Sequence, residues 1–212
     1  MTVGLGSGST AALMVQYLAA RVRQDGLKII GVPTSGATAE LASGLKIPLR
    51  DLDEVAALDI NIDGADEVDA QFRMIKGRGG ALLREKIVAS TSPRRVTMIT
   101  QEKRVSQLGL VAPIPVEVST FGLKHTERRL KNLGATTFLR RRVDGSLALT
   151  DGGNAIIDCK FPPVADPASL DAQLQCVPGV FETGLFIDLC DTLIVGSCEG
   201  VDVIQTGAPK QP

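Results

Sequence analysis

Acidic residues are concentrated in one short segment, DGADE at residues 63–67. The apolar run Ile60-Asn61-Ile62 precedes it, so the segment is predicted to lie at the carboxyl end of a strand, where open α/β sheets bind ligands. Because clustered carboxylates repel one another, one of them retains its proton to higher pH and suits proton transfer between oxygens. The segment also fits a divalent-metal site, although no histidine accompanies it, and taken alone it favours a solvated acidic turn.

The segment KGRGGALLREK, residues 76–86, combines a strand end, a glycine-rich turn and the start of a helix. Lys76 is expected at the same sheet edge as Asp63, and Glu85 more than one turn into a helix over residues 81–89. If the apolar residues of this helix are buried, Glu85 is drawn to the rim of the sheet. Partial burial there raises the pKa of its carboxyl group into the range of a general base. The alternative is an exposed glutamate paired with a neighbouring cation.

A second glycine-rich turn, GLGSGST at residues 4–10, stands between a strand stub and an Ala-rich stretch, residues 11–22, that is predicted to be a helix. Backbone N–H groups and the positive end of the helix dipole at such a junction favour an anion such as phosphate, and Ser9 and Thr10 add hydroxyl donors. No lysine precedes the Ser-Thr pair, which excludes a P-loop, and the third glycine is one residue early for a dinucleotide site. An ordinary tight turn with a Ser or Thr N-cap explains the segment equally well.

The composition excludes several other kinds of chemistry. With 23 Lys+Arg against 24 Asp+Glu and 3% aromatic residues, the chain has neither the positive field nor the stacking side chains of a nucleic-acid-binding protein. Its single histidine, His125, cannot build a multi-histidine metal site or a His-carboxylate triad. Acid-base chemistry must therefore belong to carboxylates and lysines.

The environment of the chain is predicted from its cysteines and hydropathy. The 4 cysteines form no C-x-x-C pair, so they are expected to be buried in a reducing cytosol. No apolar run approaches the roughly 20 residues of a membrane span, and the first residues do not show the basic region followed by an apolar region that a signal peptide has. A soluble cytoplasmic protein is predicted, binding neither membranes nor nucleic acid. His125 is expected on a helix surface, and the arginine runs at residues 94–95 and 140–142 in solvent or at an interface.

Strands and helices alternate over the first half of the chain, which predicts a Rossmann-like parallel sheet. After the stub and helix at the amino terminus, the expected strands are residues 28–32, 59–62, 72–75 and 96–100. The expected helices are residues 37–43 and 81–89. A βαββαβ pattern follows and predicts a ferredoxin-like α+β module. Its expected strands are residues 116–118, 136–142, 155–161 and 180–186, and its expected helices are residues 121–133 and 167–174.

The fold class is therefore α/β, with the smaller ferredoxin-like domain inserted before the last strands. A strand at residues 192–195 is expected to return to the first sheet. The predicted domains are residues 1–112 with 188–212, which form the Rossmann-like catalytic domain, and residues 113–187. Residues 208–212 are expected to be a frayed tail.

Taken together and in this order, GLGSGST, NIDGADEVD, MIKGRGGALLREKIVA and the later Lys103 closely resemble ribose-5-phosphate isomerase of type A. Residues 113–118, 150–154 and 177–180 also look like family segments, so the resemblance covers nearly the whole chain. It implies interconversion of D-ribose 5-phosphate and D-ribulose 5-phosphate in the pentose phosphate pathway. It also implies no metal or organic cofactor, and a homodimer or a larger assembly such as a homotetramer.

The resemblance assigns roles residue by residue. Glu85 matches the general base that moves a proton between C2 and C1 through a cis-enediolate. Asp63 and Asp66 match carboxylates near the sugar oxygens, Lys76 the lysine beside them, and Lys103 a positive charge at the phosphate. An aldose-ketose isomerase needs a carbon base, a proton shuttle between oxygens and a cation for the oxyanion, which these residue types supply. The expected substrate-binding residues are Ser7, Gly8, Ser9, Thr10, Asp63, Gly64, Ala65, Asp66, Lys76, Gly77, Arg78, Gly79 and Lys103.

Two features depart from the family pattern. Arg78 stands where many relatives have glycine, and no role is assigned to it. Family members normally carry an amino-terminal helix whose lysine reaches the phosphate, whereas this sequence begins within the strand. That contact is expected to be either lost by truncation or replaced.

Other activities remain as alternatives. An amino-sugar-phosphate deaminase or isomerase is the nearest enzyme rival, although DGADE together with KGxGGxLxREK fits the pentose isomerase better. A CoA-transferase needs a nucleophilic glutamate instead of a proton-transferring one. A non-catalytic sugar-phosphate sensor is normally joined to a DNA-binding helix-turn-helix segment, and none is recognisable in the sequence.

Overall fold

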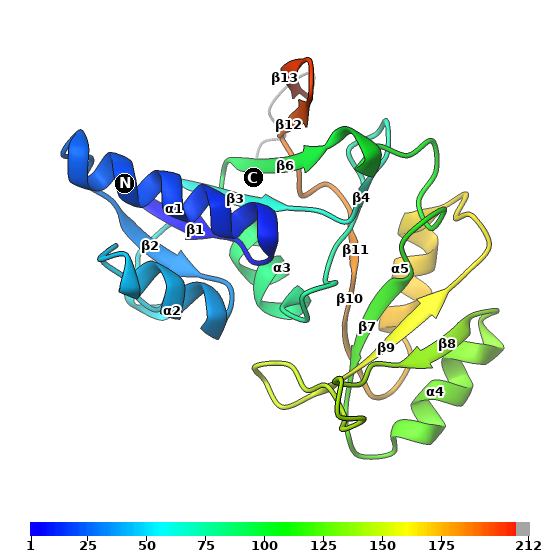
Figure 1. Cartoon of the computed structure of the whole chain (residues 1–212). Coiled ribbons are helices and arrows are strands. Elements are labelled where there is room, and N and C mark those ends of the chain that lie inside the picture. The colour runs from blue at the N-terminus through cyan, green and yellow to red at the C-terminus, as the bar shows by residue number, and fades with distance from the viewer. Residues whose placement is uncertain (207–212) are drawn as a thin grey trace. The chain divides into compact units, whose positions relative to one another are not determined.

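The computed structural model describes residues 1–206, which form two compact units (Figure 1). Unit 1 contains residues 1–65, 84–101 and the chain from residue 188 onward, and unit 2 contains residues 66–83 and 102–187. The predicted domain boundaries stay a prediction. Contacts within the chain group residues 66–83 and 102–112 with unit 2, whereas the prediction has them in the first domain. The predicted tail, residues 208–212, lies outside the described residues.

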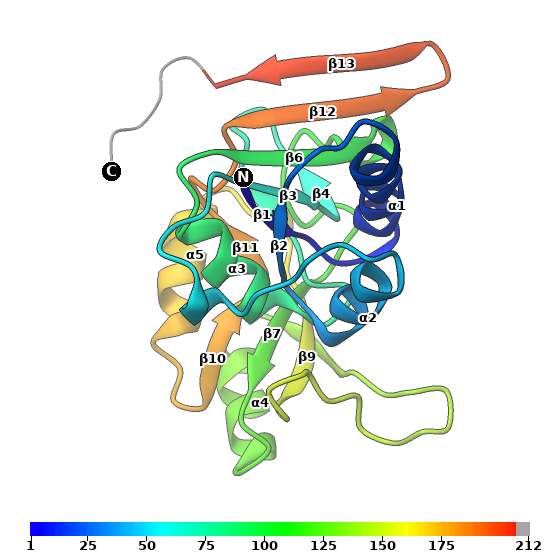
Figure 2. The same cartoon turned by 90° about the vertical axis from the view of Figure 1, so that its left-hand side faces the viewer.

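Unit 1 is built on a six-stranded sheet with the order β13-β12-β6-β3-β1-β2. All neighbours are parallel except β13, which pairs antiparallel with β12, and Figure 2 shows these two strands beside β6. The chain moves from β1 to β2 on one side and later to β3, β6 and β12 on the other, so the topological switch point lies between β1 and β3. The strands are β1 (Thr2–Leu5), β2 (Ile30–Pro33), β3 (Ile60–Gly64), β6 (Arg95–Thr100), β12 (Thr192–Ser197) and β13 (Gly200–Gln205).

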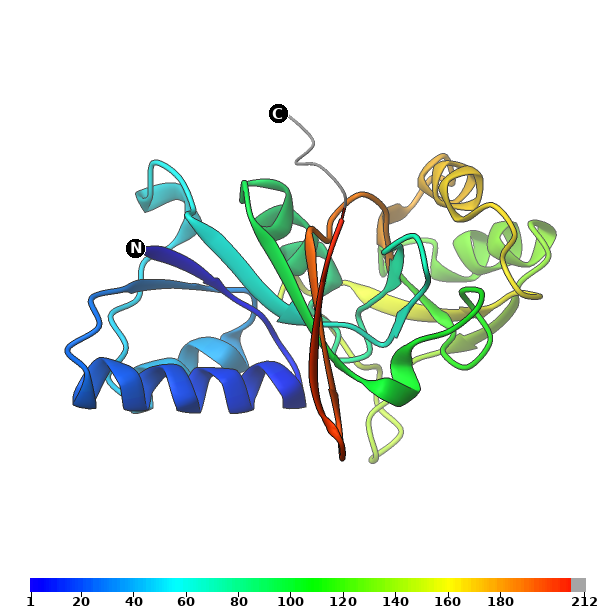
Figure 3. The ribbon, with the colours of Figure 1, turned by 90° about the horizontal axis from the view of Figure 1, so that it is seen from above.

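Helices cover both faces of this sheet (Figure 3). Helix α1 (Ser9–Gln24) buries Ala11, Val15 and Ala19, whose spacing of four places them on one side of a helix. It packs with α2 (Gly36–Gly44) on the face formed by Val3 and Leu5 of β1. On the opposite face lie the short helix η1 (Leu52–Glu54) and α3 (Leu82–Ser90). Alternate residues of β1 and β3 therefore face α3.

Unit 2 contains a four-stranded antiparallel sheet with the order β10-β7-β9-β8. In chain order this is 4-1-3-2, and helices α4 and α5 connect the first strand to the second and the third to the fourth. The predicted ferredoxin-like module is confirmed. Leu130 of α4 and Leu174 of α5 share its buried core with Val116 and Ile157 of the sheet. The elements are β7 (Ile114–Val118), α4 (Leu123–Asn132), β8 (Thr136–Leu139), β9 (Ala155–Lys160), α5 (Pro167–Gln175) and β10 (Val180–Thr183).

A small three-stranded antiparallel sheet, β11-β5-β4, also belongs to unit 2. It contains β4 (Glu67–Val68), β5 (Met74–Ile75) and β11 (Leu185–Phe186). The short helix η2 (Gln101–Lys103) lies between β6 and β7 in the chain. The prediction that the strand near residue 75 joins the parallel sheet is wrong. The single strand predicted over residues 180–186 is divided at Gly184, where an added Cβ would lie 2.4 Å from the carbonyl oxygen of Lys76.

The cysteines, which all carry free thiols, divide into two groups by exposure. Cys159 and Cys190 are buried, whereas Cys176 and Cys198 are exposed, so the expected burial is wrong for two of them. Burial raises the pKa of the Cys159 thiol to about 12 and raises the pKa of Cys190. Within residues 1–206, no helix combines the length and hydropathy needed to cross a membrane.

We expect only Cys176 and Cys198 to react rapidly with a thiol reagent such as DTNB near pH 8. The thiolate is the nucleophile, and a buried thiol with a raised pKa remains protonated and shielded at that pH. Thiol counting on native and urea-unfolded protein measures this, with the fast fraction falling by one thiol in each of the variants Cys176→Ser and Cys198→Ser. Rapid reaction of all the cysteines in the native state would contradict the assignment.

Candidate active site

One group of predicted substrate-binding residues lies in the turn between β1 and α1 of unit 1. Gly8 is the N-cap of α1, with φ of 90°, and no acidic side chain occupies the first helical turn. The N–H groups of a first turn have no partner within their helix, and Ser9 and Thr10 are the residues that supply them here. Gly8 and Ser9 are exposed. The predicted anion-binding turn is thus available to a ligand.

A cluster of hydroxyl groups supports this turn. Ser7 Oγ lies 2.7 Å from Thr34 Oγ1 and 2.8 Å from Ser35 Oγ, in the loop after β2. The Thr38 hydroxyl lies near the same group and donates to the carbonyl oxygen of Gly6 at 3.0 Å. Ser7 was expected from the sequence, whereas its three partners were not, although a second small-residue turn after β2 marks their position.

Asp63 joins the end of β3 to the turn after β1. Its Oδ1 accepts the backbone N–H of Ser7 at 3.1 Å and that of Gly64 at 2.7 Å, and the side chain is buried. Gly6 makes this approach possible, because a Cβ there would lie 2.0 Å from Asp63 Oδ1. The carboxylate therefore stands at the β1/β3 switch point, the position at which open α/β sheets bind ligands.

Glu85 lies in the first turn of α3 and is 3% exposed. It is buried more deeply than the expected rim position, and the alternative of an exposed glutamate is wrong. Leu82 and Val88, three residues before and after it, are also buried, whereas the apolar Ile87 is 44% exposed. The buried side of α3 therefore carries a carboxylate in line with its apolar residues. Burial away from water destabilises the charged form of this carboxylate, whereas its position at a helix amino terminus stabilises that form.

Lys76 and the glycine-rich turn that follows β5 belong to unit 2. Lys76 is 5% exposed, and its Nζ lies 5.4 Å from the centre of the Phe186 ring, a cation-π geometry. Gly77 has φ of 103°, and a Cβ at this position would lie 2.8 Å from Leu82 Cβ, so both backbone angle and space require glycine. Arg78 and Gly79 are exposed at the tip of the turn.

Three predicted substrate-binding residues share one cavity of about 660 Å³ in unit 2. Asp66, Arg78 and Lys103 line it, and Asp66 Oδ2 accepts the backbone N–H of Arg78 at 3.0 Å. With Glu67, Glu102, Arg140 and Asp158 also in its lining, the cavity has three cations and four carboxylates, groups that can bind the hydroxyls of a polar ligand. Arg140, which the sequence placed in a solvated or interfacial run, and Asp158, which the sequence did not single out, line the same cavity.

The acidic segment at residues 63–67 does not act as one cluster. Glu67 is 1% exposed and accepts three backbone N–H groups, from Gly109 at 2.7 Å and from Val111 and Ala112 at 2.6 Å. Its carboxylate anchors the loop before β7 and is not available for proton transfer. Within residues 1–206, no three His, Cys, Asp or Glu side chains are grouped so that they hold a metal ion.

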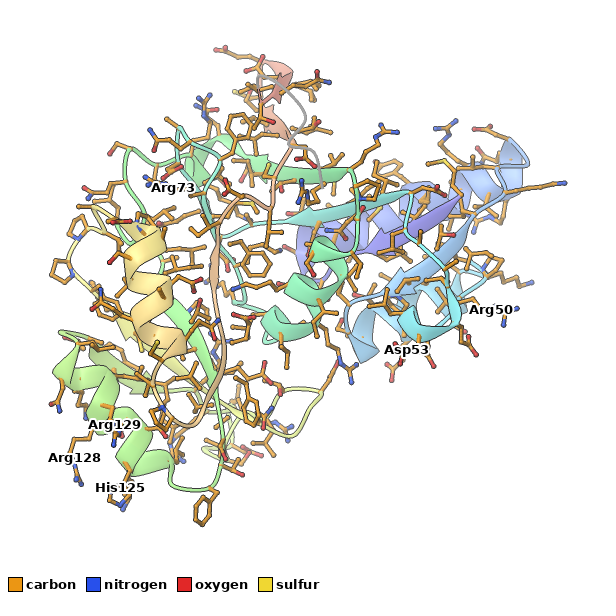
Figure 4. The ribbon with its side chains drawn as sticks, turned by 180° about the vertical axis from the view of Figure 1, so that it is seen from behind. Arg50, Asp53, Arg73, His125, Arg128 and Arg129 are labelled. Atoms are coloured by element: carbon orange, nitrogen blue, oxygen red, sulfur yellow. The ribbon has the colours of Figure 1, made fainter. Side chains whose placement is uncertain are left out.

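The Glu67→Gln variant is expected to lose about 2–3 kcal/mol of unfolding free energy, because one amide oxygen replaces a buried carboxylate that accepts hydrogen bonds from three backbone N–H groups. Urea denaturation followed by circular dichroism measures the change. The matched control is Asp53→Asn, which changes an exposed carboxylate (Figure 4) and should leave stability within about 0.5 kcal/mol of wild type. Equal stability of both variants would show that Glu67 is not an anchor.

Of the cationic surface residues, His125 lies on α4 with Arg128 and Arg129, and all three are exposed, as Figure 4 shows. The expected surface position of the histidine is confirmed. In the arginine runs, Arg94, Arg141 and Arg142 are exposed, in line with the expected solvent positions. Two members differ: Arg95 is paired with Asp191 through its Nη2 at 2.7 Å, and Arg140 is paired with Asp158. The hydrogen bonds that the Arg95 guanidinium group donates to Asp191 raise the pKa of Arg95.

Comparison with known proteins connects this geometry to a family. Residues 30–200 match the family described as Ribose 5-phosphate isomerase A (phosphoriboisomerase A). Ribose-5-phosphate isomerase A of Roseiflexus sp. (strain RS-1) is 47% identical over 212 residues, which is 100% of this chain and 91% of the relative.

Solved structures agree with the sequence match. A D-ribose-5-phosphate isomerase in complex with phospho-erythronic acid is similar with a TM-score of 0.94 and 39% identity over 97% of this chain and 91% of that one. Ribose 5-phosphate isomerase A from Methanocaldococcus jannaschii has a TM-score of 0.92 and 38% identity, over 97% of this chain and 91% of its own. The chain therefore belongs to the ribose 5-phosphate isomerase A family.

Proposed function

We propose that this protein interconverts D-ribose 5-phosphate and D-ribulose 5-phosphate, an aldose-ketose isomerisation of the non-oxidative pentose phosphate pathway. The observation that carries the proposal is Glu85, a carboxylate buried in the first turn of a helix that directly follows Lys76 and its glycine-rich turn. Such a carboxylate is fixed in position and shielded from water, as a base that removes a proton from carbon requires. Family membership supports the choice of substrate.

The proposed reaction begins with opening of the furanose ring, assisted by Asp66, Lys76 or Asp63. Glu85 then removes the C2 proton and returns it to C1, while Asp63 transfers the hydroxyl proton between O1 and O2. Lys76 and N–H groups of the turn at residues 77–80 stabilise the negative charge of the cis-enediolate. No external oxidant or reductant is needed, because C2 is oxidised from an alcohol to a ketone while C1 is reduced from an aldehyde to an alcohol, and the proton that leaves C2 is balanced by the one that C1 gains.

Two features of the chain that favour an anion are each proposed to contact the phosphate. The turn at residues 7–10 offers first-turn N–H groups and hydroxyls, and Lys103 contributes positive charge. Arg78 lines the same cavity as Lys103, so it is available as a second cation for the substrate. The mechanism uses no metal or organic cofactor.

The deciding experiment follows ketose formation from ribose 5-phosphate with and without EDTA. Turnover that EDTA leaves unchanged supports the proposal. Inhibition by EDTA would contradict the metal-free mechanism, and tight binding without turnover would favour a sugar-phosphate sensor. Ammonia release from an amino-sugar phosphate at a higher rate would favour the deaminase alternative.

We also propose that the enzyme is cytoplasmic and forms a homodimer or homotetramer. The cysteines carry free thiols, as suits a reducing compartment, and the family resemblance implies the assembly. Light scattering coupled to size-exclusion chromatography measures the mass. A monomer at working concentration would overturn the proposed assembly without affecting the proposed reaction.

A further inference from the structure

Arg140 follows strand β8 and is held by its neighbours in the four-stranded sheet. Its Nε donates to Asp158 Oδ2 at 2.9 Å, and its Nη2 donates to the other carboxylate oxygen. The two side chains are 19% and 18% exposed, so solvent screens this paired fork less than it screens a surface ion pair. The backbone N–H of Arg140 also donates to the carbonyl oxygen of Ile156 at 2.9 Å. The guanidinium group therefore has a fixed position.

The remaining nitrogen of this guanidinium contacts the glycine-rich turn. Nη1 donates to the carbonyl oxygen of Gly77 at 2.9 Å and to that of Arg78 at 3.0 Å. A guanidinium has five N–H groups, and four of them are engaged with Asp158 and the two carbonyls. Arg140 therefore acts on the turn itself, and its donors are largely unavailable to a ligand.

These contacts fix two successive peptide groups. In the first, the carbonyl of Gly77 is held by Arg140, and the N–H of Arg78 is held by Asp66 at 3.0 Å. In the second, Arg140 holds the carbonyl of Arg78, and because a trans peptide is planar, the N–H of Gly79 points to the opposite side. Gly79 is exposed, so this N–H is directed to a place that a ligand can reach.

The turn contains one hydrogen bond of its own, from the Gly80 N–H to the Gly77 carbonyl oxygen at 3.0 Å, but this bond does not hold the peptide between Arg78 and Gly79. With glycine at positions 77, 79 and 80 the backbone has wide conformational freedom, so that peptide needs a further contact to keep one orientation. A donor that stabilises a developing oxyanion contributes most when its direction is set before the reaction. Hydrogen bonds to the carbonyl side of a peptide also polarise its N–H side. The guanidinium group of Arg140, hydrogen-bonded to the carbonyl oxygens of Gly77 and Arg78, both sets the direction of the Gly79 N–H and polarises it.

We infer that Arg140 is a positioning residue, which orients the turn at residues 77–80 so that the Gly79 N–H faces the substrate oxygen on which negative charge develops. The inference rests on the proposed function. It assigns a role to one arginine of the run at residues 140–142. Arg141 and Arg142, its exposed neighbours, provide matched controls.

The test compares Arg140→Ala and Arg140→Lys with Arg141→Ala in ketose formation from ribose 5-phosphate. We expect the Arg140 variants to lose about 10- to 100-fold in kcat, with a smaller change in KM, because the oriented donor acts mainly in the transition state. Lys keeps the charge but cannot bridge Asp158 and both carbonyls, so it should restore little activity. Arg141→Ala should retain wild-type kinetics.

Chemical rescue separates positioning from a general loss of folding. Added guanidinium ion, far below denaturing concentrations, should raise the kcat of Arg140→Ala several-fold and leave wild type and Arg141→Ala unchanged. If the Ala variant does not fold, the Lys variant carries the kinetic test. Wild-type kcat in the Arg140 variants overturns the inference, as does a loss explained entirely by the unfolded fraction in a thermal melt. Absence of isomerisation in the wild-type protein would instead overturn the proposed function.

Discussion

The Glu85→Gln variant is expected to lose at least about 10²–10⁴-fold in kcat, while its KM for ribose 5-phosphate changes little. Glutamine has the same shape and volume as glutamate, so the buried side of α3 and its contacts are retained. The amide lacks the basicity needed to remove a proton from carbon. Only the proton-transfer step should therefore fail.

Isotope exchange makes this test specific for the carbon proton. Substrate carrying deuterium at C2 should lose its label to solvent with the wild-type enzyme and keep it with Glu85→Gln. The matched control is Glu40→Gln, which changes an exposed glutamate of α2 and should exchange at the wild-type rate. Label loss at the wild-type rate in Glu85→Gln would transfer the role of base to another residue.

The Gly6→Ala variant is expected to lose both activity and stability, although it adds a single methyl group. The new Cβ would lie 2.2 Å from Asp63 Cγ and 2.6 Å from Asp63 Cα, so a side-chain rotation alone does not relieve the clash. Overpacking of this kind costs about 1–3 kcal/mol. Displacing the Asp63 carboxylate by about 1 Å should lower kcat by roughly 10²-fold.

Gly44→Ala is the matched control for this prediction. Gly44 ends α2, and a Cβ there would meet no heavy atom within 4 Å. This substitution should leave kcat unchanged and keep or slightly raise the melting temperature, because alanine favours a helix. A Gly6→Ala protein with wild-type kcat and melting temperature would show that the close approach of β1 to Asp63 is not required.

Sequence patterns predicted the elements that have regular periodicity and missed those that depend on distant partners. The parallel strands and the ferredoxin-like module are long enough for their apolar patterns to be recognised. Strands β4, β5 and β11 have two residues each, and their pairing joins residues near 67, 75 and 185, which no local pattern reveals. Strand β13 was missed because Val201 and Val203 alternate with polar residues in a segment that is mostly exposed.

The same limit applies to the candidate site. Residues on turns that follow strands, such as Ser7 and Asp63, were predictable because strand ends in a parallel sheet mark the ligand edge. The contacts of Glu67 with a loop more than 40 residues later could not be inferred, since its neighbours suggested a solvated cluster. Arg140 was expected in solvent or at an interface for a similar reason: its partners, Asp158 and Gly77, are distant in sequence.

The order of strands in the six-stranded sheet has a consequence for synthesis on the ribosome. Strand β6 pairs with β12 in a register that joins Val96 to Thr192, so one edge of β6 finds its partner only when nearly the whole chain has been made. Until then the nascent chain exposes an unpaired strand edge, which is a template for aggregation. Contacts of such large sequence separation also slow folding. If folding during translation depends on a chaperone, we expect the exposed edge of β6 to be the segment that the chaperone protects until β12 has been made.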